Sequence, residues 1–122
     1  MRILVLGGIR FVGRADVDAL AEHHDVTVAN RGSHVLWRDD VALVVFDRDS
    51  GASLSLAVDV RQFDAVVNVS GTEPAHVRHV VQGWPDDWKH VPYVFISSAS
   101  VYDRSVKPPP FCEGMPTPGD AI

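Results

Sequence analysis

The sequence predicts an α/β fold in which helices cover both faces of a parallel sheet, the doubly wound arrangement. Short apolar segments alternate with segments of helical periodicity over residues 2–97, and this alternation is typical of that class. Four of the five expected strands are continuous apolar runs, as strands buried on both faces are, and only the second is mixed. A chain of 122 residues suggests one domain with a core of adequate size.

The first expected strand, 2–6, leads directly into a glycine turn. Gly7 and Gly8 follow the strand, and a helix is expected over 14–22 after Gly13. Residues without a Cβ let backbone amides approach phosphate oxygens, and the N-terminal end of the helix favours an anion. Strand, turn and helix in this order indicate a site for a dinucleotide pyrophosphate. The apolar face expected of the helix consists of Val12, Ala15, Ala19 and Leu20.

The rest of the chain supplies four more strands, expected at 26–29, 41–46, 65–69 and 93–97. A polar stretch joins the second strand to the third and ends at Asp40. The segment 50–63 is expected to be helical, and Ser70 to Glu73 has the form of a capping box that opens another helix. The residues expected to face inward are Leu54, Ala57, Val58 and Phe63 in the first of these helices, and Val77, Val80, Val81 and Trp84 in the second.

Composition narrows the function classes. The net charge is −5 and there is no basic block, which argues against nucleic acid as the main partner. The single cysteine, Cys112, cannot form an internal disulfide and fits a reducing compartment. The chain enters its first strand with no signal peptide, and no apolar run approaches the roughly 20 residues that span a membrane. These features predict a cytoplasmic protein without membrane contacts.

The glycine turn carries a family pattern. Residues 7–13 read Gly-Gly-Ile-Arg-Phe-Val-Gly and resemble the opening of the extended and atypical short-chain dehydrogenases, the NAD(P)-dependent epimerase/dehydratase family, with its fingerprint G-x-x-G-x-x-G. Gly7 and Gly13 match the ends, and Arg10 replaces the middle glycine, as in a similar branch that reads G-G-T-R-F. There Arg10 could reach a phosphate; the alternative is a surface arginine on a plain turn. The resemblance assigns to the cofactor Gly7, Gly8, Arg10, Phe11, Val12 and Gly13.

The same resemblance implies a Rossmann half-domain of about five parallel strands in the order 3-2-1-4-5. This NAD(P)-binding half-domain would cover residues 1–102. The prolines of 103–122 indicate a loop or tail, which is similar to the family's proline-containing loop between its catalytic serine and tyrosine. By this resemblance, the chain covers the cofactor half of the family's fold, and the catalytic helix and substrate region are missing.

The end of the second strand bears on the choice between NAD and NADP. NAD sites commonly place Asp or Glu there to bind the ribose 2′-hydroxyl, but this chain has Asn30 and Arg31. A guanidinium suits a 2′-phosphate through paired hydrogen bonds. We therefore expect NADP in preference to NAD, and the alternative for Arg31 is a solvated turn residue.

Two further segments resemble cofactor contacts of the family. Asp47, followed by Arg48 at the end of the third strand, resembles the aspartate that binds adenine, although Phe46 replaces a glycine of that motif. A turn aspartate is the alternative. The second segment follows the fourth strand, where the family's backbone passes under the cofactor, and consists of Val69, Ser70 and Gly71. For Ser70 a helix cap is the favoured role.

Residues 93–102 resemble the family's fifth strand, which ends in S-S-x-S-V-Y. This alignment places Ser98 at the catalytic serine position, where its hydroxyl would hydrogen-bond the substrate. Ser100 and Tyr102 would line the substrate pocket. The alternative is a serine-rich strand end without a catalytic role. The parent activity would be hydride transfer or epimerisation on a sugar nucleotide or a similar carbonyl or alcohol substrate.

The family's acid/base pair, Y-x-x-x-K on the next helix, is absent from this sequence. Tyr93 is followed four residues later by Ser97, and Tyr102 by Val106. Lys107 is one position too far, roughly 140° round a helix instead of roughly 40°. The chain is therefore not expected to be a competent enzyme. It could be a non-catalytic NADP-binding or interaction module, or a fragment that needs a second chain to supply the tyrosine and lysine.

The remaining clusters indicate structure. His76 and His79 are one helical turn apart with no cysteine or carboxylate to complete a metal set, so we expect solvated histidines and no metal. Trp84 and Trp88 are expected to pack over the sheet edge. If 93–97 is the last strand, its free edge predicts a homodimer or a covering tail.

Overall fold

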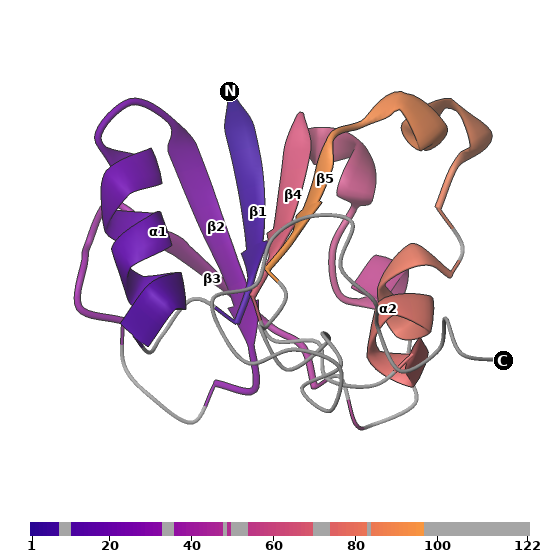
Figure 1. Ribbon diagram of the computed structural model, residues 1–122, viewed down its shortest axis with the longest axis horizontal. Helices are drawn as coiled ribbons and strands as arrows, with labels where there is room; N and C mark the ends of the chain where they lie inside the picture. Colours follow the sequence, from indigo (N-terminus) through magenta and orange to yellow (C-terminus); the bar gives the residue numbers. More distant parts are fainter. Residues whose placement is uncertain are drawn as a thin grey trace, which may run out of the picture.

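The computed structural model describes residues 1–7, 11–32, 36–47, 49, 54–69, 74–82 and 84–96. At its centre is a five-stranded sheet in which all neighbouring strands are parallel and the order is β3-β2-β1-β4-β5 (Figure 1). The strands are β1 Arg2–Leu6, β2 Asp25–Asn30, β3 Ala42–Val45, β4 Ala65–Asn68 and β5 Tyr93–Phe95. The α/β class and the strand order expected from the sequence are confirmed.

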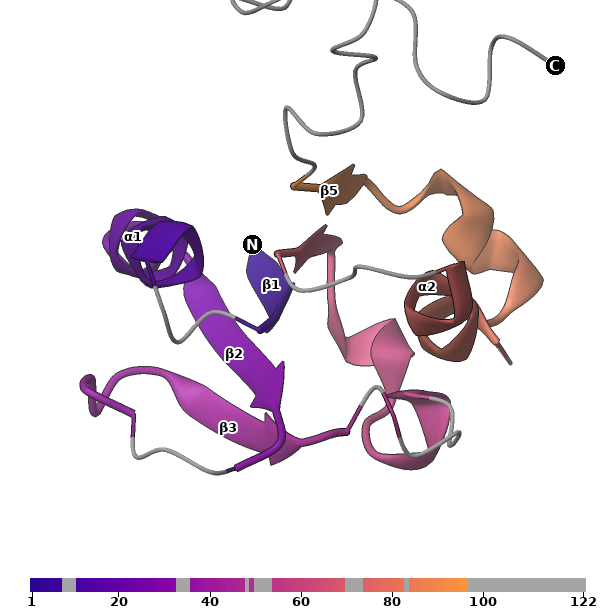
Figure 2. The same cartoon turned by 60° about the horizontal axis from the view of Figure 1, so that its bottom comes forward.

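Two α-helices of the described chain lie on opposite faces of the sheet (Figure 2). One is α1, Phe11–Ala21, and the other is α2, Pro74–Val81. The described connections also contain the 3₁₀ helices η1 Leu54–Leu56, η2 Val60–Gln62 and η3 Asp86–His90. Because the helices lie on both faces, the sheet is doubly wound, as predicted.

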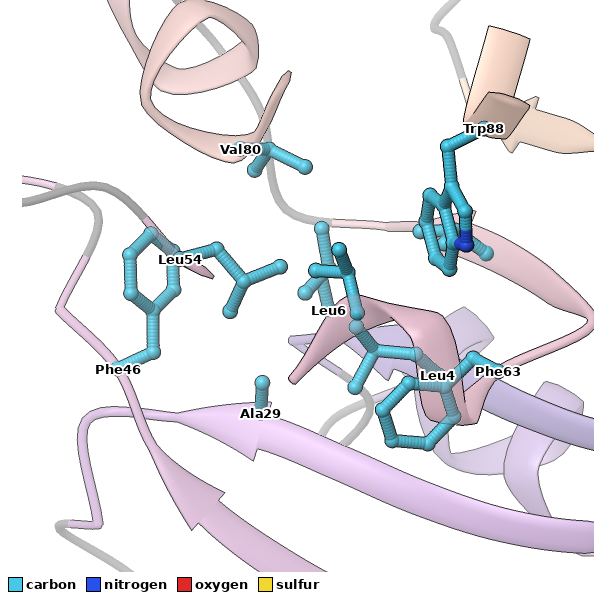
Figure 3. Close-up of a cluster of buried hydrophobic side chains, with 10 residues drawn as sticks. Leu4, Leu6, Ala29, Phe46, Leu54, Phe63, Val80 and Trp88 are labelled. Carbon is cyan, nitrogen blue, oxygen red and sulfur yellow. The ribbon is translucent and has the colours of Figure 1, made fainter. Parts of the chain in front are cut away.

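Each face of the sheet has its own hydrophobic core. On the α1 side, Val17 packs against alternate residues of the two central strands, Ile3, Val5, Val26 and Val28. On the other side, Leu4 and Leu6 face a second cluster (Figure 3), which includes Ala29, Phe46, Leu54, Phe63, Val80 and Trp88. Both faces of β1 are therefore apolar and buried, as expected for the central strand of a sheet that is covered on both sides.

The helix expected over 50–63 is wrong for the described part of that segment. Its residues form η1 and η2, with Asp59 between them in an extended conformation, φ −77° and ψ 103°. The Asp59 carboxylate accepts a hydrogen bond from the Arg61 amide at 3.0 Å. An aspartate that bonds the backbone locally favours a cap over a continuous helix. Of the residues expected to face inward, Leu54 and Phe63 are buried, Val58 is half-buried and Ala57 is exposed.

The buried face of α1 differs from the expected one. Gly13 and Val17 are buried and Leu20 is half-buried against the core, which is a spacing of four and three residues. The expected residues Val12, Ala15 and Ala19 are exposed. Gly13 has no side chain to contribute to an apolar pattern, so the pattern pointed to the neighbouring position.

The same correction applies to α2. Its buried residues are His76 and Val80, while Val81 is 41% exposed. Of the helix residues expected to face inward, Val80 is buried as expected and Val77 is half-buried. His76 was not expected there, because a histidine does not contribute to an apolar pattern. Trp84 lies beyond the helix and packs against the core as expected, with its ring 4.5 Å from that of Trp88 in an edge-to-face arrangement.

Residues 36–41, between β2 and β3, form a non-helical segment beside α1, which we call the 36–41 segment. Trp37 donates from Nε1 to Asp18 Oδ1 at 2.7 Å. Arg38 donates to the same oxygen at 3.3 Å and to both carboxylate oxygens of Asp40 at 2.8 Å each. Leu36 and Trp37 also pack on the α1-side core. These contacts fasten the segment to the helix.

The sheet ends at β3 on one side and β5 on the other. Both edge strands expose apolar side chains, with Val45 63% exposed on β3, and Val94 49% and Phe95 42% exposed on β5. None of the helices in the described ranges is long and apolar enough to cross a membrane.

Candidate functional site

The carboxyl ends of β1, β2 and β4 meet at one edge of the sheet (Figure 1). Leu6, at the end of β1, lies between Ala29 of β2 and Asn68 of β4. From β1 the chain continues to β2 and β3 on one side and returns to β4 and β5 on the other, so the topology switches here. Open α/β sheets bind ligands in the crevice at such a place. We call it the switch-point edge.

The turn that leaves β1 at this edge requires a glycine. Gly7 has a φ of 105°, in the left-handed region. A residue with a side chain would be strained in this conformation, and glycine is not. Its amide donates to the carbonyl of Ala29 at 3.0 Å, which holds the turn against the end of β2. The chain then enters α1 at Phe11. The described residues thus bring together a strand end, a glycine turn and a helix N-terminus, as a phosphate site requires.

The other residues that the sequence assigns to this turn have different positions. Val12 is exposed at the start of α1, and the next residue, Gly13, is buried. The backbone of Phe11 begins the helix. Gly8 and Arg10 lie outside the described residues.

The end of β2 forms a tight turn built on Asn30. The Oδ1 atom of Asn30 accepts a hydrogen bond from the Gly32 amide at 2.6 Å, and Gly32 has a φ of 74°. The Nδ2 atom of Asn30 is buried and has no hydrogen-bond partner among the described residues. A buried donor without an acceptor is costly, so this atom fits a ligand that brings an oxygen. Arg31 follows it and is exposed.

The end of β3 lies next to that of β2, where the Phe46 amide donates to the carbonyl of Asn30 at 2.7 Å. Asp47 is exposed there, and its Oδ1 atom accepts a hydrogen bond from the Asp49 amide at 2.9 Å. Asp47 therefore lies at the end of β3, and its carboxylate stabilises a local turn. This turn is the alternative to adenine binding that the sequence left open. Arg48 lies outside the described residues.

His76 is buried, which corrects the expectation of a solvated histidine. Its Nε2 atom is 2.9 Å from Oδ1 of Asp49, and the residue is only 6% exposed. The pair joins α2 to the loop after β3. His79 is half-buried on the same helix. In the described ranges no three His, Cys, Asp or Glu side chains gather as a metal site would need.

Asn68 is a residue of the switch-point edge that sequence reasoning missed. It ends β4, is 2% exposed, and donates from Nδ2 to the Tyr93 hydroxyl oxygen at 2.8 Å. Burial raises the pKa of the Tyr93 phenol above 10.0, although the hydrogen bond from Asn68 acts in the other direction. One polar residue at the carboxyl end of an apolar strand was the available signal. The bond fixes the end of β4 to β5 at the switch-point edge.

Val69 continues the backbone pairing past the end of β4. Its amide donates to the carbonyl of Leu6 at 3.0 Å, and its side chain packs on the α1-side core. Ser70 and Gly71 lie outside the described residues, and so do Ser98, Ser100, Tyr102 and the whole of 103–122. The division of the chain at residue 102 therefore stays a prediction.

No family model matches this chain, and no curated protein matches it either. Among solved structures it is similar to the crystal structure of the oxidoreductase ylbE from Lactococcus lactis, with 20% identity and a TM-score of 0.63. The similarity covers 88% of this chain and 53% of that one, so the chain spans about half the length of that protein. At this identity the likeness shows a shared fold, a Rossmann-like parallel sheet.

Proposed function

We propose that this chain binds a nicotinamide dinucleotide at the switch-point edge, as the cofactor half of an oxidoreductase of the extended or atypical short-chain dehydrogenase type. The observation that carries the proposal is the turn at Gly7, which leads from β1 to α1 in a left-handed conformation where the sheet topology switches. Such a turn lets a pyrophosphate approach the backbone and the helix N-terminus. The fold likeness to an oxidoreductase supports the same class.

The end of β2 supports NADP in preference to NAD. Asn30 offers a buried amide donor without a described partner, and Arg31 offers an exposed guanidinium beside it. Both groups donate hydrogen bonds, which suits a 2′-phosphate. A ribose 2′-hydroxyl is usually bound by a carboxylate at this place, and neither residue is acidic.

The proposed site extends along the same edge. Asp47 would contact the adenosine end of the cofactor, and the backbone at Val69 would pass beneath it. The other residues that the family resemblance assigns to the cofactor are Gly8, Arg10, Phe11, Val12, Gly13, Arg48, Ser70 and Gly71.

We propose that this chain binds its cofactor without turning over a substrate by itself. The bound cofactor would supply a hydride, and the chain would contribute the Ser98 hydroxyl, with Ser100 and Tyr102 beside the substrate. The sequence contains no Y-x-x-x-K pair to move the proton. The chain is then either a non-catalytic NADP-binding module or a half that a second chain completes.

The outer edge of β5 is the proposed surface for self-association, since Val94 and Phe95 expose apolar area and no other strand of the described residues pairs with that edge. The proline-rich tail, which lies outside the described residues, is the alternative cover. A cytoplasmic location, without membrane or nucleic-acid partners, stays a prediction from composition.

Titration calorimetry with NADPH and NADH tests the cofactor proposal. We expect NADPH to bind more tightly. Arg31→Ala should narrow the difference by about 1–3 kcal/mol, the scale of one hydrogen bond to a charged group. Arg61→Ala is a matched control, because Arg61 is an exposed arginine of η2, which precedes β4.

The two parts of the proposal fail separately. Equal affinities for the two dinucleotides would remove the preference for NADP and leave dinucleotide binding intact. Binding of neither would remove the function itself.

A further inference from the structure

His76 joins two parts of the switch-point edge that belong to different halves of the sheet. It lies in the first turn of α2, which follows β4, and its Nε2 atom is 2.9 Å from Oδ1 of Asp49 in the loop after β3. In the sheet, β3 and β4 are separated by β2 and β1. The pair therefore connects the two halves of the sheet across the place where the topology switches.

The buried member of the pair is the donor. A carboxylate only accepts hydrogen bonds, so the Nε2 atom of His76 carries the hydrogen. His76 is buried in α2, whereas the side chain of Asp49 is 59% exposed. A buried donor that loses its acceptor is costly, so the helix supplies a fixed point to which the loop after β3 is bonded.

Asp49 passes this restraint to Asp47. The amide of Asp49 donates to Oδ1 of Asp47 at 2.9 Å, while its side chain bonds His76. On the other side of the turn, the Phe46 amide donates to the carbonyl of Asn30 at 2.7 Å. The turn is thus tied to β2 and to α2. A carboxylate has about four acceptor positions, so the bond to the Asp49 amide is compatible with a bond from a ligand.

We propose that His76 is a positioning residue for the adenosine part of the dinucleotide and acts through Asp49 on the turn of Asp47. The inference rests on the proposed function, in which Asp47 contacts that part. A turn that is already fixed loses less conformational entropy when a ligand binds. Removing the tie therefore weakens binding although His76 itself does not touch the ligand. NADPH and NADH both contain the adenosine, so the affinity of both depends on His76.

Titration calorimetry of the full chain with NADPH and NADH measures the effect. His76→Leu removes the donor and places an apolar side chain in a buried position, and it should weaken both dinucleotides by the same factor, roughly fivefold. Asp49→Ala should do the same, because it keeps the backbone amide and removes the carboxylate. Asp49→Asn keeps an oxygen that accepts from His76 and should retain most of the affinity.

Val80→Ala is the matched control for the packing of α2. Val80 lies one turn beyond His76 and belongs to the core cluster of Figure 3. Its truncation loosens the helix on the sheet and leaves the bond between His76 and Asp49 in place. The affinities for both dinucleotides should therefore stay within twofold of wild type.

A double-mutant cycle separates positioning from a general structural role. Asp47→Ala should weaken binding more than His76→Leu does, because it removes the proposed contact itself. The double variant, with both substitutions, should bind as weakly as Asp47→Ala alone, since His76 then has no contact to position. Losses that multiply would show two independent effects and overturn the inference.

The other outcomes are equally distinct. Unchanged affinities in His76→Leu or in Asp47→Ala overturn the inference and leave dinucleotide binding standing. A loss in Val80→Ala as large as that in His76→Leu also overturns it, because the packing of α2 would then be the cause. Where His76→Leu fails to fold, Asp49→Ala and Asp49→Asn decide the matter, since they change an exposed side chain. A wild-type chain that binds neither dinucleotide overturns the proposed function and this inference with it.

Discussion

Among single residues, Tyr93 is expected to make the protein less stable at high pH. Burial raises the pKa of its phenol above 10.0, so the tyrosine of the unfolded chain loses its proton first. The stability that the neutral phenol contributes is complete below pH 10 and is lost as the pH rises through the folded pKa. Tyr93→Phe should therefore lower the free energy of unfolding by about 1–3 kcal/mol at pH 7, because buried Asn68 loses this acceptor. The difference from wild type should shrink above pH 10.

Urea unfolding at pH 7 and pH 11 measures both effects. Tyr102→Phe removes the other phenol of the chain and serves as the control. If the free energy of unfolding falls as much from pH 7 to pH 11 in Tyr93→Phe as in wild type, ionisation of Tyr93 does not cause the fall.

At this scale the sequence predicts residues whose role follows from local chemistry. The left-handed turn at Gly7 is visible in a few neighbouring letters, while the cofactor role of Asn30 and Arg31 stays a prediction. It does not predict His76 or Asn68 correctly, because the acceptor of each is far along the chain. Asp49 is 27 residues from His76, and Tyr93 is 25 residues from Asn68. Whether such a polar side chain is buried depends on a partner that only the fold brings near.

Among the elements, the 36–41 segment packs on the α1-side core although it is not a helix. Its hydrogen bonds to Asp18 hold it against α1. The hydrogen bond from Trp37, with the contacts from Arg38, lowers the pKa of the Asp18 carboxyl below 3.8. Asp18→Ala should lower the free energy of unfolding at pH 7, because it removes the acceptor that Trp37 and Arg38 share. The contribution is present above the usual pKa and is lost as the pH falls through the folded value.

The free energies of unfolding of wild type and Asp18→Ala are measured at pH 7 and at pH 3, and the difference between them should be smaller at pH 3. Asp39→Ala, an exposed aspartate of the same segment, is the matched control and should change little. A loss in Asp39→Ala equal to that in Asp18→Ala would show that the charge, and not the anchor, matters.

The elements themselves were predictable to different degrees. The apolar run of β1 is predictable because this strand is buried on both faces. The edge strands β3 and β5 also have apolar runs, but most of their residues are exposed, so the expectation that they are buried on both faces is wrong. The helical prediction over 50–63 failed where Asp59 bonds the backbone beside it. The buried faces of α1 and α2 were misplaced where Gly13 and His76 interrupt the apolar pattern. In each case a single local interaction or residue outweighed the periodicity.

For the whole molecule, the exposed edge of β5 predicts association. Sedimentation velocity should show a dimer that forms with increasing concentration, because edge strands pair unless they are covered. Val94→Lys should weaken it, since a charge would enter the apolar contact. Val45→Lys places the same charge on the opposite edge strand, β3, and should leave the association unchanged. A monomer at all concentrations after deletion of 103–122 would contradict the prediction, and so would a greater effect from Val45→Lys.

The proposed lack of turnover is also a property of the whole chain. Without the tyrosine and lysine, proton transfer would lose on the order of 10²–10⁴-fold in rate. We expect no oxidation of NADPH with sugar nucleotides or small ketones in stopped-flow absorbance, and no difference between wild type and Ser98→Ala. Turnover that Ser98→Ala abolishes would show that another residue, with Tyr102 the first to test, has taken over the proton transfer.

The position of β1 in the sheet has a consequence for folding. β1 lies in the middle of the sheet although it precedes the other described strands in the chain, and its Arg2 amide bonds the side chain of Asp64, 62 residues later. Loop closure of that length comes before the central pairing can form, so folding is expected to be slow for a chain of this size. Until β4 is made, one edge of β1 has no neighbour, and the nascent chain exposes the same apolar strand that later carries the glycine turn. A deletion that begins after Leu6 would remove the centre of the sheet and leave β2 and β4 without a strand between them.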